Sequence, residues 1–196
     1  MIYTSSITSS SLRLRESRIV ADLLLKGMTK KEWVDAMVEQ NILQMNSAET
    51  IRRVSRLLRA RIEPLGEGLW SMLRDGSKIQ ATQAALAGSI KHSRLLGDFM
   101  DITIRDQRQL FANSLKPTMW GDYIEGCRGR DPDMPHWGDA TVVKLRSVVF
   151  CILAEAGYLQ NTKRLLMQNV YVDGQLAAYL RDNNESYVLK CMEVME

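Results

Sequence analysis

Five arginines crowd into residues 47–62, SAETIRRVSRLLRARI, and they are the residues whose type and spacing first suggest chemistry. They are Arg52, Arg53, Arg56, Arg59 and Arg61, set against a single acid, Glu49. A guanidinium is planar, always charged and well matched to phosphate oxygens. The whole chain carries a net charge of only +3, so this positive charge is local. Two interpretations stand open: a phosphate-contacting surface, hence nucleic acid, or an ordinary surface helix that is solvated or pairs with acids elsewhere.

The element that must position these arginines is an amphipathic helix. Ser47 is a suitable N-cap, and Pro64 follows the last apolar position. At about 100° per residue, Arg52, Arg56 and Arg59 fall within roughly 60° of one another. The apolar stripe on nearly the opposite side is formed by Ile51, Val54, Leu58 and Ile62. The spacing therefore predicts that one face is buried while the other presents a row of guanidiniums.

A second basic set lies in the C-terminal half. Lys144 falls on an expected long helix over 140–156, which Gly157 ends, and Lys163 and Arg164 follow in the next loop. Helix, glycine, short strand and basic loop is the order of a winged-helix unit, and an ordinary solvated turn is the alternative. We predict that these three residues form a second DNA contact.

Catalytic and metal-binding patterns are missing from the sequence. It contains no nucleotide-binding glycine motif, no HExxH and no GxSxG. His92 ends an expected helix, where a cation suits the dipole, and His136 lies in a proline-rich loop. The three cysteines show no CxxC spacing. We predict no enzymatic activity, no catalytic residues, no metal and no cofactor.

The remaining pattern predicts a mainly α, compact multi-helix protein with at most a short β-hairpin in its C-terminal third. The expected division is an N-terminal helical domain over 1–115, with the basic helix 47–62, and a C-terminal helical domain over 116–196, which is the winged-helix candidate. No apolar run approaches the roughly 18 residues of a membrane span, and the N-terminus lacks an apolar signal region. Unpaired cysteines suit a reducing cytosol. We therefore expect a cytoplasmic protein without a membrane partner.

Four stretches resemble one known family. They are YTSSITSSSLRLRESRIVADLLLKG near the start, EQNILQMNSAETIRRVSRLLRARI, TVVKLRSVVFCILAEAGYL and YVDGQLAAYLRDNNESYVLKCM. Together they are similar to BrxA proteins of bacterial BREX phage-resistance systems. The resemblance implies a helical fold that is NusB-like in part, DNA binding without known enzymatic activity, and neighbours that include a methyltransferase and an ATPase.

From charge and resemblance together we predict an accessory protein of phage defence. It would bind double-stranded DNA largely through phosphates and with little sequence preference, because the arginine face offers few Asn or Gln base readers. One alternative is a scaffold whose basic helix docks other defence proteins. Another is RNA binding by analogy with NusB.

Overall fold

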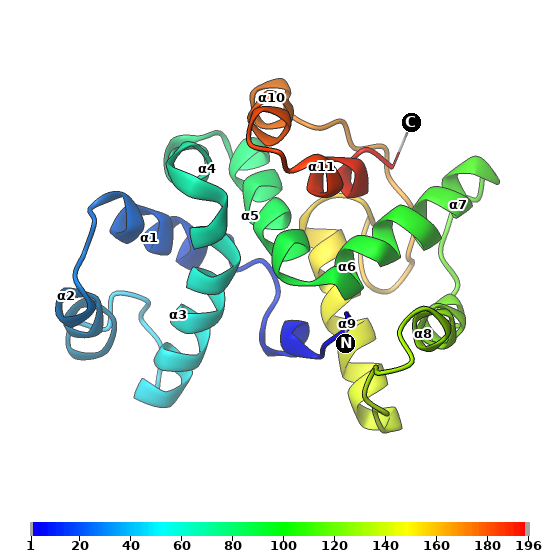
Figure 1. Ribbon diagram of the computed structural model, residues 1–196, viewed down its shortest axis with the longest axis horizontal. Helices are drawn as coiled ribbons and strands as arrows, with labels where there is room; N and C mark the ends of the chain where they lie inside the picture. Colours follow the sequence, from blue (N-terminus) through cyan, green and yellow to red (C-terminus); the bar gives the residue numbers. More distant parts are fainter. Residues whose placement is uncertain (1, 195–196) are drawn as a thin grey trace.

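A computed structural model describes residues 2–194, and this part of the chain is mainly helical (Figure 1). The α-helices are α1 (Leu14–Leu25), α2 (Lys30–Val34), α3 (Ala48–Ile62), α4 (Gly66–Asp75), α5 (Lys78–His92), α6 (Arg94–Asp98), α7 (Arg105–Gln109), α8 (Met119–Arg130), α9 (Asp139–Glu155), α10 (Gly174–Asp182) and α11 (Ser186–Met192). Short 3-10 turns form η1 (Ser6–Ser9) and η3 (Glu63–Leu65), and π-helical turns form η2 (Asp35–Glu39) and η4 (Phe99–Ile104). The predicted mainly α fold class is confirmed.

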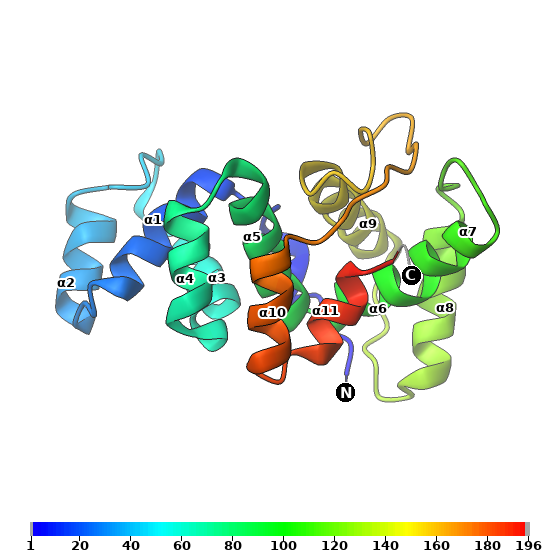
Figure 2. The ribbon, with the colours of Figure 1, turned by 90° about the horizontal axis from the view of Figure 1, so that it is seen from above.

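The helices are arranged in two halves joined by α5. Helices α1 to α4 lie on the left of Figure 1, and α6 to α9 lie on the right. Figure 2 shows α10 and α11 lying over α5 and α6, and α10 contacts α4 as well as α5. One cluster of buried apolar side chains includes residues from Tyr3 to Val194. Elements before and after residue 115 therefore share a core, and the division into 1–115 and 116–196 stays a prediction.

Several helices begin where the sequence places a capping side chain. The hydroxyl of Ser47 accepts a hydrogen bond from Thr50 N at 3.2 Å, and Ser77 caps α5 in the same way. Asp173 accepts from two amides at the start of α10, and Thr29 forms a full capping box with Glu32. These four caps fix the entry points of α3, α5, α10 and α2.

The stretch from Arg94 to Gln109 forms consecutive helical segments, with the π-helical turn η4 between α6 and α7. The side chain of Phe99 in that turn is fully buried. Its ring lies 5.1 Å from Trp120 and 5.1 Å from Tyr123, in edge-to-face geometry. This aromatic cluster packs α8 against the α6–α7 segment.

The segment after α9 was expected to carry the only β character. One isolated antiparallel bridge, Leu159 with Met167, lies within it, and a second joins its Leu166 to Ser114 in the loop before α8; no strand is present among residues 2–194. Backbone hydrogen bonds from Gln160 N to Leu166 O and from Gln168 N to Tyr158 O, at 2.8 and 2.9 Å, close a hairpin-like turn. The expectation of at most a short hairpin is thus met.

Candidate nucleic-acid interface

The N-terminal half of α3 borders a surface groove of about 560 Å³. The groove also contacts turn η1 and the end of α5, and its polar lining comes from Ser6, Glu49, Arg52, Arg53, Arg56 and His92. Three guanidiniums face one carboxylate there, so the lining is positively charged. The groove opens at the surface, and its charge suits an anionic ligand. We call it the α3 groove.

Arg52 and Arg56 are exposed, and within residues 2–194 neither guanidinium has an ion-pair or hydrogen-bond partner. Arg53 is also exposed and lines the same groove. Four residues separate Arg52 from Arg56, so the two side chains lie one above the other on one helix face. The structure thus brings three of the five predicted arginines together at a surface open to a ligand.

Arg59 is oriented differently from the expectation. Its guanidinium makes two contacts with the carboxylate of Glu63, at 2.9 and 2.6 Å, and lies 4.7 Å from the ring of Trp33. The hydrogen bond raises the pKa of Arg59 and lowers the pKa of Glu63. The carboxylate of Glu63 and the ring of Trp33 already contact this guanidinium. Arg59 is not among the residues that line the α3 groove.

Arg61 requires a correction, because it was predicted to lie on the phosphate-contacting surface. The side chain is buried, and its terminal nitrogens donate to Ser11 O at 2.8 Å and Ser10 O at 2.9 Å. Burial lowers its pKa to about 10, which leaves it cationic at neutral pH. The sequence held a signal for this burial. Arg61 follows Val54 of the apolar stripe by seven residues, which places it about 20° from Val54 around the helix axis.

What Arg61 holds is an N-terminal arm, residues 2–13, that crosses from α3 to α9 (Figure 1). Tyr3, Ile7 and Leu12 of the arm are buried. The carboxylate of Glu155 at the end of α9 accepts from Leu12 N at 2.8 Å. The polar, partly β-branched sequence of residues 1–11 is compatible with an extended arm, a short strand or disorder. The structure shows a docked arm whose η1 turn forms one wall of the α3 groove.

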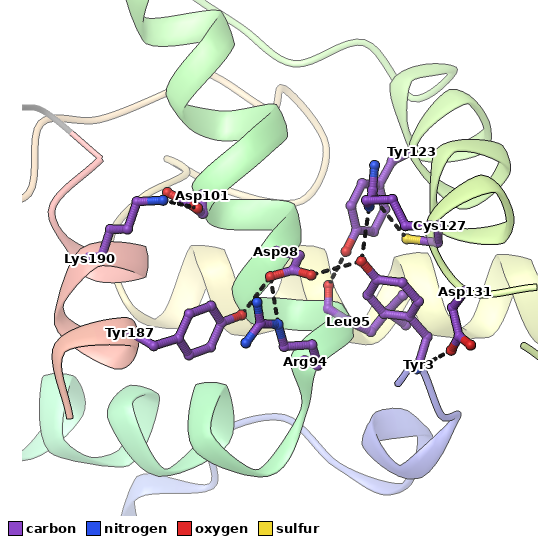
Figure 3. Close-up of polar contacts among 11 residues, drawn as sticks. Tyr3, Arg94, Leu95, Asp98, Asp101, Tyr123, Cys127, Asp131, Tyr187 and Lys190 are labelled. Atoms are coloured by element: carbon purple, nitrogen blue, oxygen red, sulfur yellow. Dashed lines mark hydrogen bonds and ion pairs between the residues drawn. The ribbon is translucent and has the colours of Figure 1, made fainter. Parts of the chain in front are cut away.

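A polar network anchors the tip of the arm (Figure 3). The buried carboxylate of Asp98 accepts from Tyr3 Oη and Tyr187 Oη, each at 2.7 Å, and from Arg94 Nε at 2.9 Å. Arg130 Nε donates to Tyr3 Oη at 3.0 Å, and burial raises the pKa of Tyr3 to about 12. The groups satisfy one another, so the network serves to join the arm, α6, α8 and α11.

His92 sits in the α3 groove, although its position at a helix end suggested only a dipole-compensating cation. Burial lowers its pKa, and the nearby charge of Arg61 lowers it further. His92 is therefore neutral at pH 7, which differs from the cation that the sequence suggested. The nearby positive charge could not be foreseen, because Arg61 was expected to lie on the surface.

The second predicted set is divided by the fold. Lys144 is exposed in the first half of α9, roughly 17 Å along the helix axis from Glu155. Lys163 and Arg164 are exposed at the tip of the hairpin-like turn, where Asn161 Oδ1 accepts from both of their backbone amides, at 3.0 and 2.8 Å. Helix α9 and the turn after it, which carry these residues, lie in the half of the molecule opposite α3 (Figures 1 and 2).

Residues 2–194 contain no group of three His, Cys, Asp or Glu side chains arranged to hold a metal ion. No helix in this part of the chain has the length and hydropathy of a membrane span.

Fold and site together define a small all-helical protein with a basic helical groove. The BrxA family model matches residues 1–184. A BREX protein BrxA from Paramagnetospirillum magneticum is 47% identical over 98% of this chain and 96% of its own length. The chain belongs to the BrxA family. A BREX protein BrxA from Escherichia coli O9:H4 is 26% identical over 97% of the chain and 90% of its own length.

A solved structure supports the fold. The crystal structure of an uncharacterized protein from Magnetospirillum magneticum superimposes with a TM-score of 0.93 at 45% identity. The match covers 99% of this chain and all of the other. The arrangement of helices around the α3 groove is therefore that of an experimentally determined protein.

Proposed function

We propose that this BrxA-family protein is an accessory component of a BREX phage-resistance system and binds double-stranded DNA through the α3 groove. The observation that carries the proposal is the pair of exposed guanidiniums, Arg52 and Arg56, on one face of a helix anchored in the core. Membership of the BrxA family supports the role in phage defence. A DNA ligand implies a cytoplasmic location, and the methyltransferase and ATPase of such systems are the proposed neighbours.

Contact with phosphates should dominate the binding. Arginine forks match phosphate oxygens, and rigid helical positions fix their spacing along a strand. Within the described part of the chain the groove lining includes no Asn or Gln to read base edges. Glu49 in the same lining opposes an anionic ligand and limits the affinity. The expected behaviour is binding with little sequence preference and a strong salt dependence.

Lys144, Lys163 and Arg164 are proposed as auxiliary contacts. Few guanidiniums give only weak, non-specific affinity at physiological salt, so a second contact region would strengthen binding. Since these residues lie in the other half of the molecule, a DNA that reaches both regions must extend across the protein. This part of the proposal depends on charge and exposure alone.

The test is fluorescence anisotropy with a labelled duplex at several salt concentrations. The double variant Arg52→Ala with Arg56→Ala should bind every duplex sequence more weakly by a similar factor. The matched control is Arg181→Ala with Lys190→Ala, which removes two exposed cations from α10 and α11 outside the groove. The control should bind as the wild type does.

Equal affinity of the double variant and the wild type would remove the α3 groove from the proposal. Absence of duplex binding by the wild type, even at low salt, would favour the scaffold alternative, and tighter binding of RNA than of duplex DNA would favour the RNA alternative. Circular dichroism of each variant controls for folding.

A further inference from the structure

The residue at the C-terminal end of α7 is unusual in two respects. Phe111 has a positive φ of 55° and is 91% exposed. Its amide donates to Arg108 O at 2.9 Å, so it occupies the left-handed position after a helix end, where glycine or asparagine is normally preferred. A bulky side chain is strained there, and an exposed ring gains nothing from the core. Together with Leu110, which is 73% exposed, it points to an external ligand.

Exposed cations lie on the segments next to this ring. Backbone hydrogen bonds from Leu115 N to Leu165 O and from Met167 N to Asn113 O, at 3.0 and 2.9 Å, join the loop after α7 to the hairpin-like turn. The two segments lie side by side on the right of Figure 2. Lys163 and Arg164 are thereby carried to the same end of the molecule as Phe111. Lys116, in the loop itself, is exposed as well.

A groove of about 530 Å³ lies beside the ring. The amide side chains of Gln109, Asn113 and Asn169 line it, and in the described part of the chain none of the three has a hydrogen-bond partner. An amide offers both a donor and an acceptor, as a nucleobase edge does. Arg108, which also lines the groove, donates to Gln168 O and fastens α7 to the segment that carries Asn169.

We propose that this site, the Phe111 tip, binds an unpaired nucleobase, so that the protein prefers DNA containing unpaired bases to fully paired DNA. The ring would stack on the base, the free amides would meet its edge, and the flanking cations would hold the adjacent phosphates. Bases inside a duplex are stacked on both sides and cannot reach a protruding ring. The inference rests on the proposed DNA binding and names the DNA structure that would be preferred.

A protein ligand suits the tip less well. Protein-docking surfaces have a contiguous apolar centre with few charges. Here two exposed apolar side chains lie beside a groove lined by amides, and exposed cations lie on the adjoining segments. That mixture of ring, amide and positive charge is the one that binds single strands.

The experiment compares an intact duplex with the same duplex carrying a central bulge of unpaired bases, in competition against the labelled bulged DNA. The wild type should prefer the bulged DNA. Phe111→Gly should lose about tenfold in affinity for the bulged DNA, the effect of losing one base–aromatic stack, and nothing for the intact duplex. Phe111→Trp should retain the preference. Ile79→Ala, which trims another exposed apolar side chain on α5, is the matched control.

Phe111→Gly also separates function from structure, because glycine relieves the strained backbone. Its melting temperature should equal or exceed that of the wild type. Equal affinity of the wild type for both DNAs, or equal losses on both in Phe111→Gly, would overturn the inference and leave duplex binding standing. Wild-type DNA binding in Phe111→Gly with loss of a co-purifying BREX protein would assign the tip to protein docking. Failure to bind any DNA would overturn the proposed function together with the inference.

Discussion

The two halves of α3 use the same residue type for different purposes. In the first half, Arg52 and Arg56 face the α3 groove without partners among residues 2–194. In the second half, Arg59 is held by Glu63 and Trp33, and Arg61 is buried against the N-terminal arm. The count of five arginines therefore overstates the charge that a ligand can reach. What decides the role of each arginine is which elements pack against that turn of the helix.

The largest effect should come from the buried half. Arg61→Ala leaves two carbonyls of the arm without their donors and Glu155 without its nearby cation. The free energy of unfolding should fall by about 1–3 kcal/mol for each buried carbonyl that is left without a donor. Urea denaturation measures this fall, and Arg74→Ala, a surface substitution, serves as the control. A variant as stable as the wild type would mean that this guanidinium does not hold the arm.

The second-largest effect concerns DNA binding by the half of the molecule that lies opposite α3. Lys163→Glu with Arg164→Glu should weaken DNA binding severalfold, because two exposed cations become anions. Adding Arg56→Glu should nearly abolish binding, since both contact regions are then reversed in charge. The double variant should stay within about 0.5 kcal/mol of wild-type stability, as surface changes usually do. Wild-type affinity in the double variant would confine the contact to α3.

The smallest effect is a pH dependence at the groove. In the unfolded chain His92 takes up a proton near its ordinary pKa of about 6.5, whereas in the fold its pKa is lowered by burial and by Arg61. The unfolded state therefore binds more protons as the pH falls through that value, and stability decreases. His92→Gln should remove this part of the loss, so the stability difference between variant and wild type should shift in favour of the variant below pH 6.5. A stability difference between His92→Gln and the wild type that does not change with pH would contradict the lowered pKa of His92.

Local signals predicted much of the fold. Ser47 was recognised as a cap, and Ser77 and Asp173 are caps of the same local kind, because a cap depends on neighbouring residues only. The exposure of Arg52 and Arg56 followed from helix periodicity in the same way. These features need no knowledge of distant segments.

The roles of the other α3 arginines depend on residues far away in the sequence. Arg61 is buried because the arm at Ser10 and Ser11 docks on it, about fifty residues earlier in the chain. The guanidinium of Arg59 lies over the ring of Trp33 in α2, which is separated from α3 by a loop. Helix periodicity predicts the direction in which a side chain points but not which distant segment packs against it. The only local sign that Arg61 would be buried was its position close to Val54 on the helix.

The most direct test compares Arg56→Ala with Arg59→Ala on one duplex. Both substitutions remove one guanidinium from the same face of the same helix, three residues apart. Arg56→Ala should reduce the slope of log K against log salt by roughly 0.9, the value for one lost phosphate contact, while Arg59→Ala should leave the slope unchanged. Equal changes in the two variants, or a change in Arg59→Ala alone, would contradict the claim that the first half of α3, with Arg52 and Arg56, is the half that binds DNA.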